Sequence, residues 1–178
     1  LISPSLFYIM ATQITPTTEL QAVNTMLSVI GEAPVNTLAG STTTDVSIAI
    51  NLLNETSMSV QSMGWNFNTH YNYNVSVDDT GKIPLPSNCV QADASSANRS
   101  YNWVMRNGHL YDLDNHTDIF TSDKQLDVVL VQQFEHLPEY ARRYITAKAA
   151  RRFAARTIGD GELCLLYTSP SPRDLYQS

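Results

Sequence analysis

The sequence offers little material for disulfide or metal chemistry. Only two of its 178 residues are cysteine, Cys89 and Cys164. Cys164 lies in a terminal stretch that does not look native, and a lone Cys89 cannot support a disulfide framework. The four histidines are scattered and no Cys/His spacing fits zinc, so each histidine is expected at the surface or in a hydrogen bond. We therefore expect no metal site and no cofactor.

Long apolar runs and the common catalytic motifs are also absent. No apolar stretch approaches the roughly 20 residues that cross a bilayer. The sequence has no GxSxG elbow, HExxH helix, Walker loop or GxGxxG turn. One acidic cluster resembles the carboxylate groupings that hold hard cations, and its members are Asp112, Asp114, Asp118 and Asp123. It lacks the glycine and the terminal glutamate of an EF-hand loop, so a solvated loop is favoured and we expect no enzymatic activity.

Charge is distributed unevenly along the chain. Residues 1–81 contain six acidic residues and no Lys or Arg, so their formal charge equals the −6 of the whole chain. Two interpretations fit this asymmetry. The charged faces are simply solvated, or an acidic surface of one subunit meets a basic helix of the next, in a contact that repeats around a ring. The basic residues that crowd onto one predicted helix are Arg142, Arg143, Lys148, Arg151, Arg152 and Arg156. The candidate subunit-interface residues are Lys148, Arg151, Arg152 and Arg156.

Hydrophobic spacing predicts three helices, at about 17–30, 45–63 and 137–158. The first two contain few charged residues and therefore need cover on more than one side, from the protein's own core or from a neighbouring subunit. In the last helix the apolar stripe changes side halfway. Ala141 and Ile145 share one face, whereas the later residues Ala150 and Ala154 lie roughly opposite. A kink or an early end explains this change, and so does a helix whose two halves pack against different bodies.

The first helix has a marked start and end. Its apolar stripe consists of Leu20, Val23, Leu27 and Ile30. Thr15 or Thr17 is expected to cap the start, and Pro16 suits the first turn. Gly31 stands where a helix ends in a left-handed residue, and Pro34 prevents the helix from restarting.

Between about 65 and 132 the hydrophobic period changes from 3.6 to 2. Apolar and polar residues alternate over 65–78, which predicts a strand with one apolar and one polar face. A turn is expected at 78–81, and Asn107-Gly108 predicts a type I′ hairpin. The segment 126–132 is predicted to form a buried closing strand. The predicted fold is α+β: a helical bundle of two N-terminal helices plus a C-terminal helix, with a small antiparallel sheet inserted.

Four short sequence motifs follow one another along the chain. They are AVN–IGE–PV within 19–38, VQSMGWNFN at 60–68, LYD at 110–112, and FEHLPE at 134–139 before an Ala/Arg-rich helix. Together they resemble the tail tubular protein A family of short-tailed, T7-like bacteriophages, the head-to-tail adaptors. The resemblance runs from about residue 12 to residue 161.

The resemblance implies a structural virion protein of the tail, assembled in the cytoplasm of the bacterial host. Its copies would form a dodecameric ring between the portal protein and the tail nozzle protein. DNA would pass through the ring during ejection without sequence-specific binding, and no membrane span is implied. Two alternatives from other classes are a virion-associated wall-degrading hydrolase and a nucleic-acid-binding module.

Both ends of the chain differ in character from the part between them. Residues 1–9 precede Met10 and are interpreted as non-native upstream translation, because they lack the basic start and long apolar run of a signal peptide. Residues 10–163 are predicted to form a single adaptor-like domain. Residues 164–178 contain CLLYTSPSPRD, which resembles the translation of a sequencing adapter; a natural Ser/Pro-rich tail is the alternative.

Overall fold

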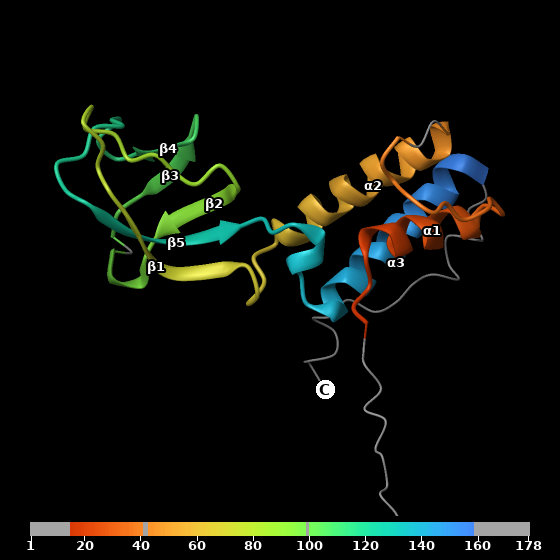
Figure 1. The fold of residues 1–178 in the computed structure, drawn as a ribbon. Coiled ribbons are helices and arrows are strands. Elements are labelled where there is room, and N and C mark those ends of the chain that lie inside the picture. Colours follow the sequence, from red (N-terminus) through yellow and green to blue (C-terminus); the bar gives the residue numbers. More distant parts are fainter. Residues whose placement is uncertain (1–14, 41–42, 99, 159–178) are drawn as a thin grey trace, which may run out of the picture.

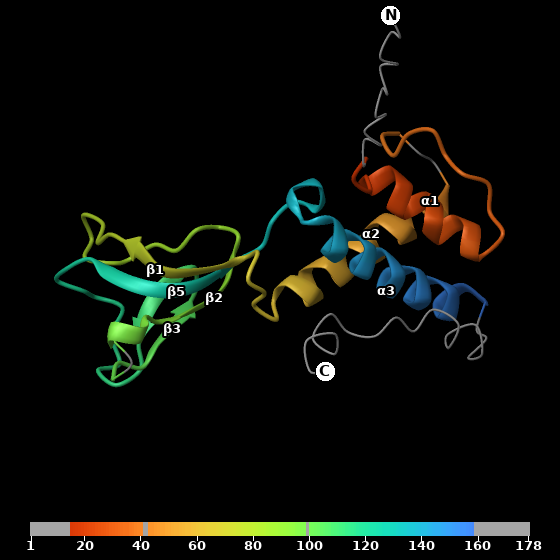
Figure 2. The ribbon, with the colours of Figure 1, turned by 90° about the horizontal axis from the view of Figure 1, so that it is seen from below.

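The computed structural model of the protein describes residues 15–40, 43–98 and 100–158. Within these ranges, three α-helices gather at one end of the molecule: α1 (Glu19–Val29), α2 (Thr44–Gln61) and α3 (Glu139–Ile158). Strands form the other end: β1 (Thr69–Val75), β2 (Cys89–Ala94), β3 (Trp103–Arg106), β4 (His109–Asp112) and β5 (Lys124–Leu130). Figures 1 and 2 both show the strands projecting from one end of the helices. The predicted α+β fold is confirmed; the interpretations of residues 1–9 and 164–178 lie outside the described residues.

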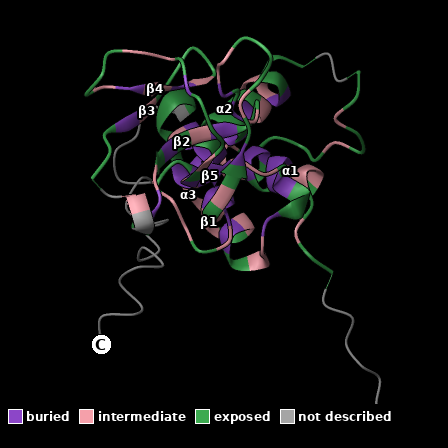
Figure 3. Ribbon diagram, turned by 90° about the vertical axis from the view of Figure 1, so that its left-hand side faces the viewer, coloured by how far each residue is buried: buried purple, intermediate pink, exposed green. Residues whose placement is uncertain are grey.

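The helical bundle has one continuous core, to which all three helices contribute. Its completely buried side chains include Met26 of α1, Leu53 of α2 and Phe153 of α3. Figure 3 shows buried stretches on the helices as well as on the strands. Around Asn24 of α1 the chain covers its own helix, because the Asn24 amide exchanges two hydrogen bonds with the backbone of Val35, at 2.8 and 2.9 Å. The extra cover expected for α1 therefore comes at least partly from its own chain.

The start of α1 differs from the prediction. Thr18 caps the helix, not Thr15 or Thr17, and it forms a reciprocal capping box with Gln21. Pro16 consequently precedes the helix and is not part of its first turn. The end agrees with the prediction, since Gly31 has a φ of +80° directly after the last turn.

Helix α3 neither ends early nor needs a second body to bury its later apolar residues. It runs unbroken to Ile158 and packs against both α1 and α2. Ala150 and Phe153 are buried in the same core as Ala141 and Ile145. The buried side moves around the helix because its two neighbours in the bundle lie on different sides of it. The hypothesis that these later apolar residues pack on a neighbouring subunit is therefore wrong.

The strand lobe encloses a second core. Three strands pair in antiparallel fashion in the order β1-β5-β2, so the buried strand that was predicted to close the sheet is its central strand. The β3–β4 hairpin forms a separate two-stranded sheet. Fully buried side chains between the two layers include Ile83, Leu110, Leu126 and Val128. The hairpin turn is the predicted one, with φ of +52° at Asn107 and +74° at Gly108.

Strand β1 is shorter and less regular than the predicted alternation. The pairing shifts between His70 and Tyr73, and Asn72 has a φ of +53°. A bulge adds one residue on its strand and so interrupts the alternation of sides. As a result Tyr71, which was predicted on the apolar face, is 68% exposed.

Two chain segments join the lobes at the neck, which comprises residues 61–68 and 130–132. Gln61 and Asn68 are both 0% exposed there. The Gln61 side chain accepts a hydrogen bond from the Gln132 N–H at 2.8 Å and donates one to the Gln132 carbonyl at 3.0 Å. The Asn68 side chain donates to the Gln61 carbonyl at 2.9 Å. Both segments are thereby bonded to the last turn of α2.

Trp65 and Gly64 complete the neck. The indole N–H of Trp65 donates to the Val60 carbonyl at 2.7 Å, and its ring packs against the helical core. Gly64 has a φ of +69°, and a Cβ at this position would lie 3.3 Å from Val129 Cγ2. The chain thus turns sharply where β1 was predicted to begin, so Trp65 and Phe67 belong to the bundle and not to the sheet.

None of the helices in the described ranges combines the length and the apolar character needed to span a bilayer.

Replacing Gln61 by Leu is expected to lower the free energy of unfolding by about 1–3 kcal/mol, because the Gln132 N–H and carbonyl lose their partner in the neck. Urea unfolding measures this change. The matched control is Ser62→Ala, which removes an exposed hydroxyl bonded only within α2 and should stay within about 0.5 kcal/mol of wild type. Equal stability of all three proteins would contradict the importance of the neck bonds.

Candidate subunit interface

The four candidate interface residues lie on one side of α3. Lys148, Arg152 and Arg156 follow each other at intervals of four residues, and Arg151 lies three after Lys148, so their side chains share a face. Arg156 is exposed and the other three are half-buried. The structure therefore brings the predicted residues together, as a basic strip along the second half of α3.

Arg152 is held by its own subunit. Its guanidinium donates to a Glu55 carboxylate oxygen at 2.6 Å and to the Thr56 hydroxyl at 3.1 Å, both on α2. Lys148 has a different environment, since its Nζ lies 5.9 Å from the centroid of the Tyr144 ring. These contacts distinguish Arg152, which ties α3 to α2, from Lys148, which lies beside Tyr144, and from Arg156, which is exposed.

The acidic residues of 1–81 do not form a single surface to match this strip. Glu55 is bonded to Arg152, and Asp78 accepts hydrogen bonds from its own turn. Glu19 lies close to Glu135, and burial together with that neighbouring charge raises the pKa of Glu19. The acidic half of the sequence is thus dispersed over both lobes.

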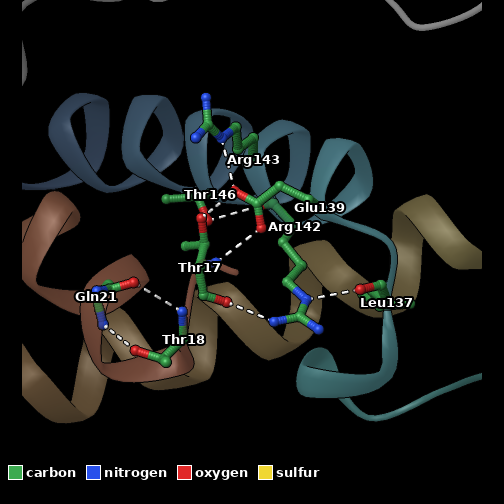
Figure 4. A network of polar contacts seen from close by, with 8 residues as sticks. All are labelled: Thr17, Thr18, Gln21, Leu137, Glu139, Arg142, Arg143 and Thr146. Carbon is green, nitrogen blue, oxygen red and sulfur yellow. Dashed lines mark hydrogen bonds and ion pairs between the residues drawn. The ribbon is translucent and has the colours of Figure 1, made fainter. Parts of the chain in front are cut away.

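A polar clamp that sequence reasoning missed joins the start of α1 to the start of α3 (Figure 4). The Glu139 carboxylate accepts hydrogen bonds from the Thr17 N–H at 2.8 Å and from the Thr17 hydroxyl at 2.7 Å. Arg142 reaches the same place from α3 and donates to three carbonyls, those of Leu137, Thr17 and Glu135. The Arg142 side chain is therefore directed inward, although it belongs to the basic run.

The clamp changes the acidity of Glu139. Hydrogen bonds from the Thr17 hydroxyl, from Arg143 and from the Thr17 N–H favour the carboxylate and lower the pKa of Glu139 to about 2. Arg143 lies 2.7 Å from the same carboxylate, but its side chain is 75% exposed. The sequence signal for this clamp was the FEHLPE phrase itself, whose last residue is Glu139.

The acidic cluster after the hairpin is divided among separate partners. Asp112 accepts hydrogen bonds from the side chain and backbone of Asn115 and from the N–H of Asp114, which hold the pKa of Asp112 below its usual range. Asp118 pairs with Lys82 at 2.7 Å, and Asp123 binds the Val77 N–H. Among the described residues, no group of three or more His, Cys, Asp or Glu is placed to hold a metal ion.

Two comparisons with known proteins bear on this arrangement. A family model described as "Tail tubular protein" matches residues 20–169, a range that includes both lobes and the neck. The chain is also similar to "Tail tubular protein A" of Klebsiella phage KP34, with 29% identity over 127 residues. That match covers 71% of this chain and 66% of the relative, so the chain spans just under two thirds of the relative's length.

Replacing Glu139 by Gln is expected to destabilise the protein most at neutral pH. The folded-state pKa of Glu139 is lowered, so its contribution is complete above the ordinary value of 4.5 and is lost as the pH falls toward about 2. Urea midpoints of wild type and variant should therefore differ at pH 7 and converge near pH 2. A difference that is independent of pH would show that the carboxylate charge has no role.

Arg152 and Arg156 are expected to respond differently to replacement by Ala. Arg152→Ala removes the bonds to Glu55 and Thr56 and should lower the stability of the isolated subunit by about 1 kcal/mol. Arg156→Ala is the matched control and should stay within about 0.5 kcal/mol. Thermal unfolding of the monomeric state measures both. Equal losses of stability in the two variants would contradict the conclusion that Arg152, and not Arg156, ties α3 to α2.

Proposed function

The chain belongs to the tail tubular protein family, and we propose that it is a structural subunit of a bacteriophage tail that works by assembling into a ring. The ring, expected to be a dodecamer, joins the portal protein to the tail nozzle protein and conducts DNA during ejection. The name of the relative from Klebsiella phage KP34 supports a place in the tail. The chain is accordingly proposed to act in the virion tail, after assembly in the host cytoplasm, and not as an enzyme.

The observation that carries the assembly proposal is the basic strip of α3. The buried apolar residues of α3 pack in the bundle, whereas Arg156 is exposed and Lys148 is half-buried beside Tyr144. Arg152 of this strip bonds to α2 within the subunit, whereas Lys148 and Arg156 are not part of the buried core. Arg is also enriched at protein interfaces. The strip is therefore suited to a contact between subunits.

The proposed passage of DNA is consistent with the overall charge. The chain has a formal charge of −6 and a sequence pI of about 5.0. The wall of a channel formed by such chains would repel the phosphates of DNA and would not bind them tightly. A wall-degrading hydrolase, the alternative, requires a nucleophile or a metal pair gathered in a cleft. The aspartates after the hairpin instead bind separate partners within their own lobe.

Mixing the full chain with the portal ring of the same virus tests the proposal. We expect a stoichiometric complex that contains a closed ring of this chain, visible by electron microscopy and by mass measurement. The control is the same portal mixed with Gln61→Leu protein, whose neck is weakened. A chain that stays monomeric and does not bind the portal would overturn the adaptor function.

A further inference from the structure

The strand lobe has an excess of acidic residues, whereas one helix of the bundle, α3, has an excess of basic residues. Residues 69–130, which form the strand lobe, contain eight aspartates and four Lys or Arg. Helix α3 contains six Lys or Arg and one Glu. Helix α3 packs on α1 and α2, while the strand lobe projects away from the bundle in both views of the ribbon. The two charged surfaces therefore lie apart within one chain.

The three-stranded sheet presents a like-charged pair on its outer face. Ala92 lies opposite Val128, and these side chains belong to the core of the lobe. Because sides alternate along a strand, the next pair in register, Asp93 opposite Asp127, points to the other face. Asp93 is exposed and Asp127 is half-buried. Like charges directly opposite each other on neighbouring strands are destabilising.

Neutral groups hold these two carboxylates in place. The Asn72 N–H donates to Asp127 at 3.0 Å, and the Gln91 side-chain amide donates to Asp93 at 2.7 Å. The salt bridges formed within the described residues are Lys82–Asp118, Arg143–Glu139 and Arg152–Glu55, and none of them involves Asp93 or Asp127. The repulsion on this face is therefore not relieved by an ion pair in the described part of the chain.

We propose that the exposed face of α3 docks on the outer face of the three-stranded sheet of a second copy of this chain. Lys148 and Arg156 of one copy then approach Asp93 and Asp127 of the next, and the cations relieve the repulsion between the two aspartates. The acidic surface that the strip meets is thus the sheet, and not the acidic residues of 1–81 as a group.

The two faces lie on different lobes, so the contact is heterologous. Each copy uses its helix face toward one neighbour and its sheet face toward the other. Such a contact generates a ring when the rotation closes. This inference rests on the proposed ring, and it specifies which surfaces form the ring.

The test uses two charge-reversed variants of the full chain. Lys148→Glu with Arg156→Glu reverses the helix face, and Asp93→Lys with Asp127→Lys reverses the sheet face. Each variant alone is expected to associate at least tenfold more weakly than wild type, because each contact then brings like charges together. A 1:1 mixture should recover assembly, because the two variants complement each other when they alternate. Sedimentation and mass photometry measure association, and native mass spectrometry with isotope labelling measures the alternation.

The matched control for the sheet variant carries the same change in net charge, at positions away from both faces. Glu32→Lys with Asp79→Lys alters two exposed carboxylates and should assemble like wild type. If wild type assembles and both reversed variants assemble equally well, the proposed contact is wrong while the ring remains. Weak variants whose mixture does not recover also overturn the contact. A wild-type chain that does not associate at all would instead overturn the ring and the contact together.

Discussion

The buried amide of Gln61 is the constraint on which the arrangement of the two lobes depends. It stands at the end of α2 and bonds to both the N–H and the carbonyl of Gln132, where the chain returns from the sheet. Asn68 binds the outgoing segment to the same turn of α2. Since both amides are fully buried, breaking these bonds leaves polar groups without partners and costs more than the bonds contribute when intact. The sheet lobe is therefore held in a defined orientation relative to the bundle.

This constraint gives a physical meaning to the phrases on which the family resemblance rests. VQSMGWNFN contains Gln61, Gly64 and Asn68 of the neck. The other phrases also fall at places where distant segments or a tight turn are fixed. Asn24 binds Val35, and Glu139 binds Thr17. Residues that must make such specific hydrogen bonds form a recognisable sequence motif. An apolar stripe, in contrast, can be formed by many different sequences. The family could therefore be recognised from the sequence, because the four motifs contain residues that bind distant segments together or form a tight turn.

Local patterns predicted the elements but not the contacts between them. The three helices, the Asn107-Gly108 turn and the α+β class follow from period and turn chemistry and are found in the structure. The bulge in β1 was not predicted, because the alternation in composition continues through Asn72. The apolar stripe of α3 changes side halfway along the helix, and the sequence left two explanations open. A periodic pattern does not show which neighbours lie on each side of a helix.

The residues of the candidate site could be predicted from the sequence. The sequence did not show which of them bind within their own subunit. The sequence placed the basic residues on one helix, yet the bond between Arg152 and Glu55 joins residues far apart in sequence. The same limit applies to Asp93 and Asp127, whose opposition appears only when the strands are in register. A subunit with a fixed neck carries its basic helix face and its acidic sheet face at a constant separation. That fixed separation is what a repeating contact around a ring requires.

Amide hydrogen exchange at the neck tests this account most directly. The N–H of Gln132 donates to the Gln61 side chain, and the N–H of Leu130 donates to the Asn68 carbonyl. If the two lobes form one rigid unit, both amides should exchange as slowly as those in the middle of α2. Exchange at the rate of exposed loops, with α2 still protected, would show that the lobes move independently and would contradict the account.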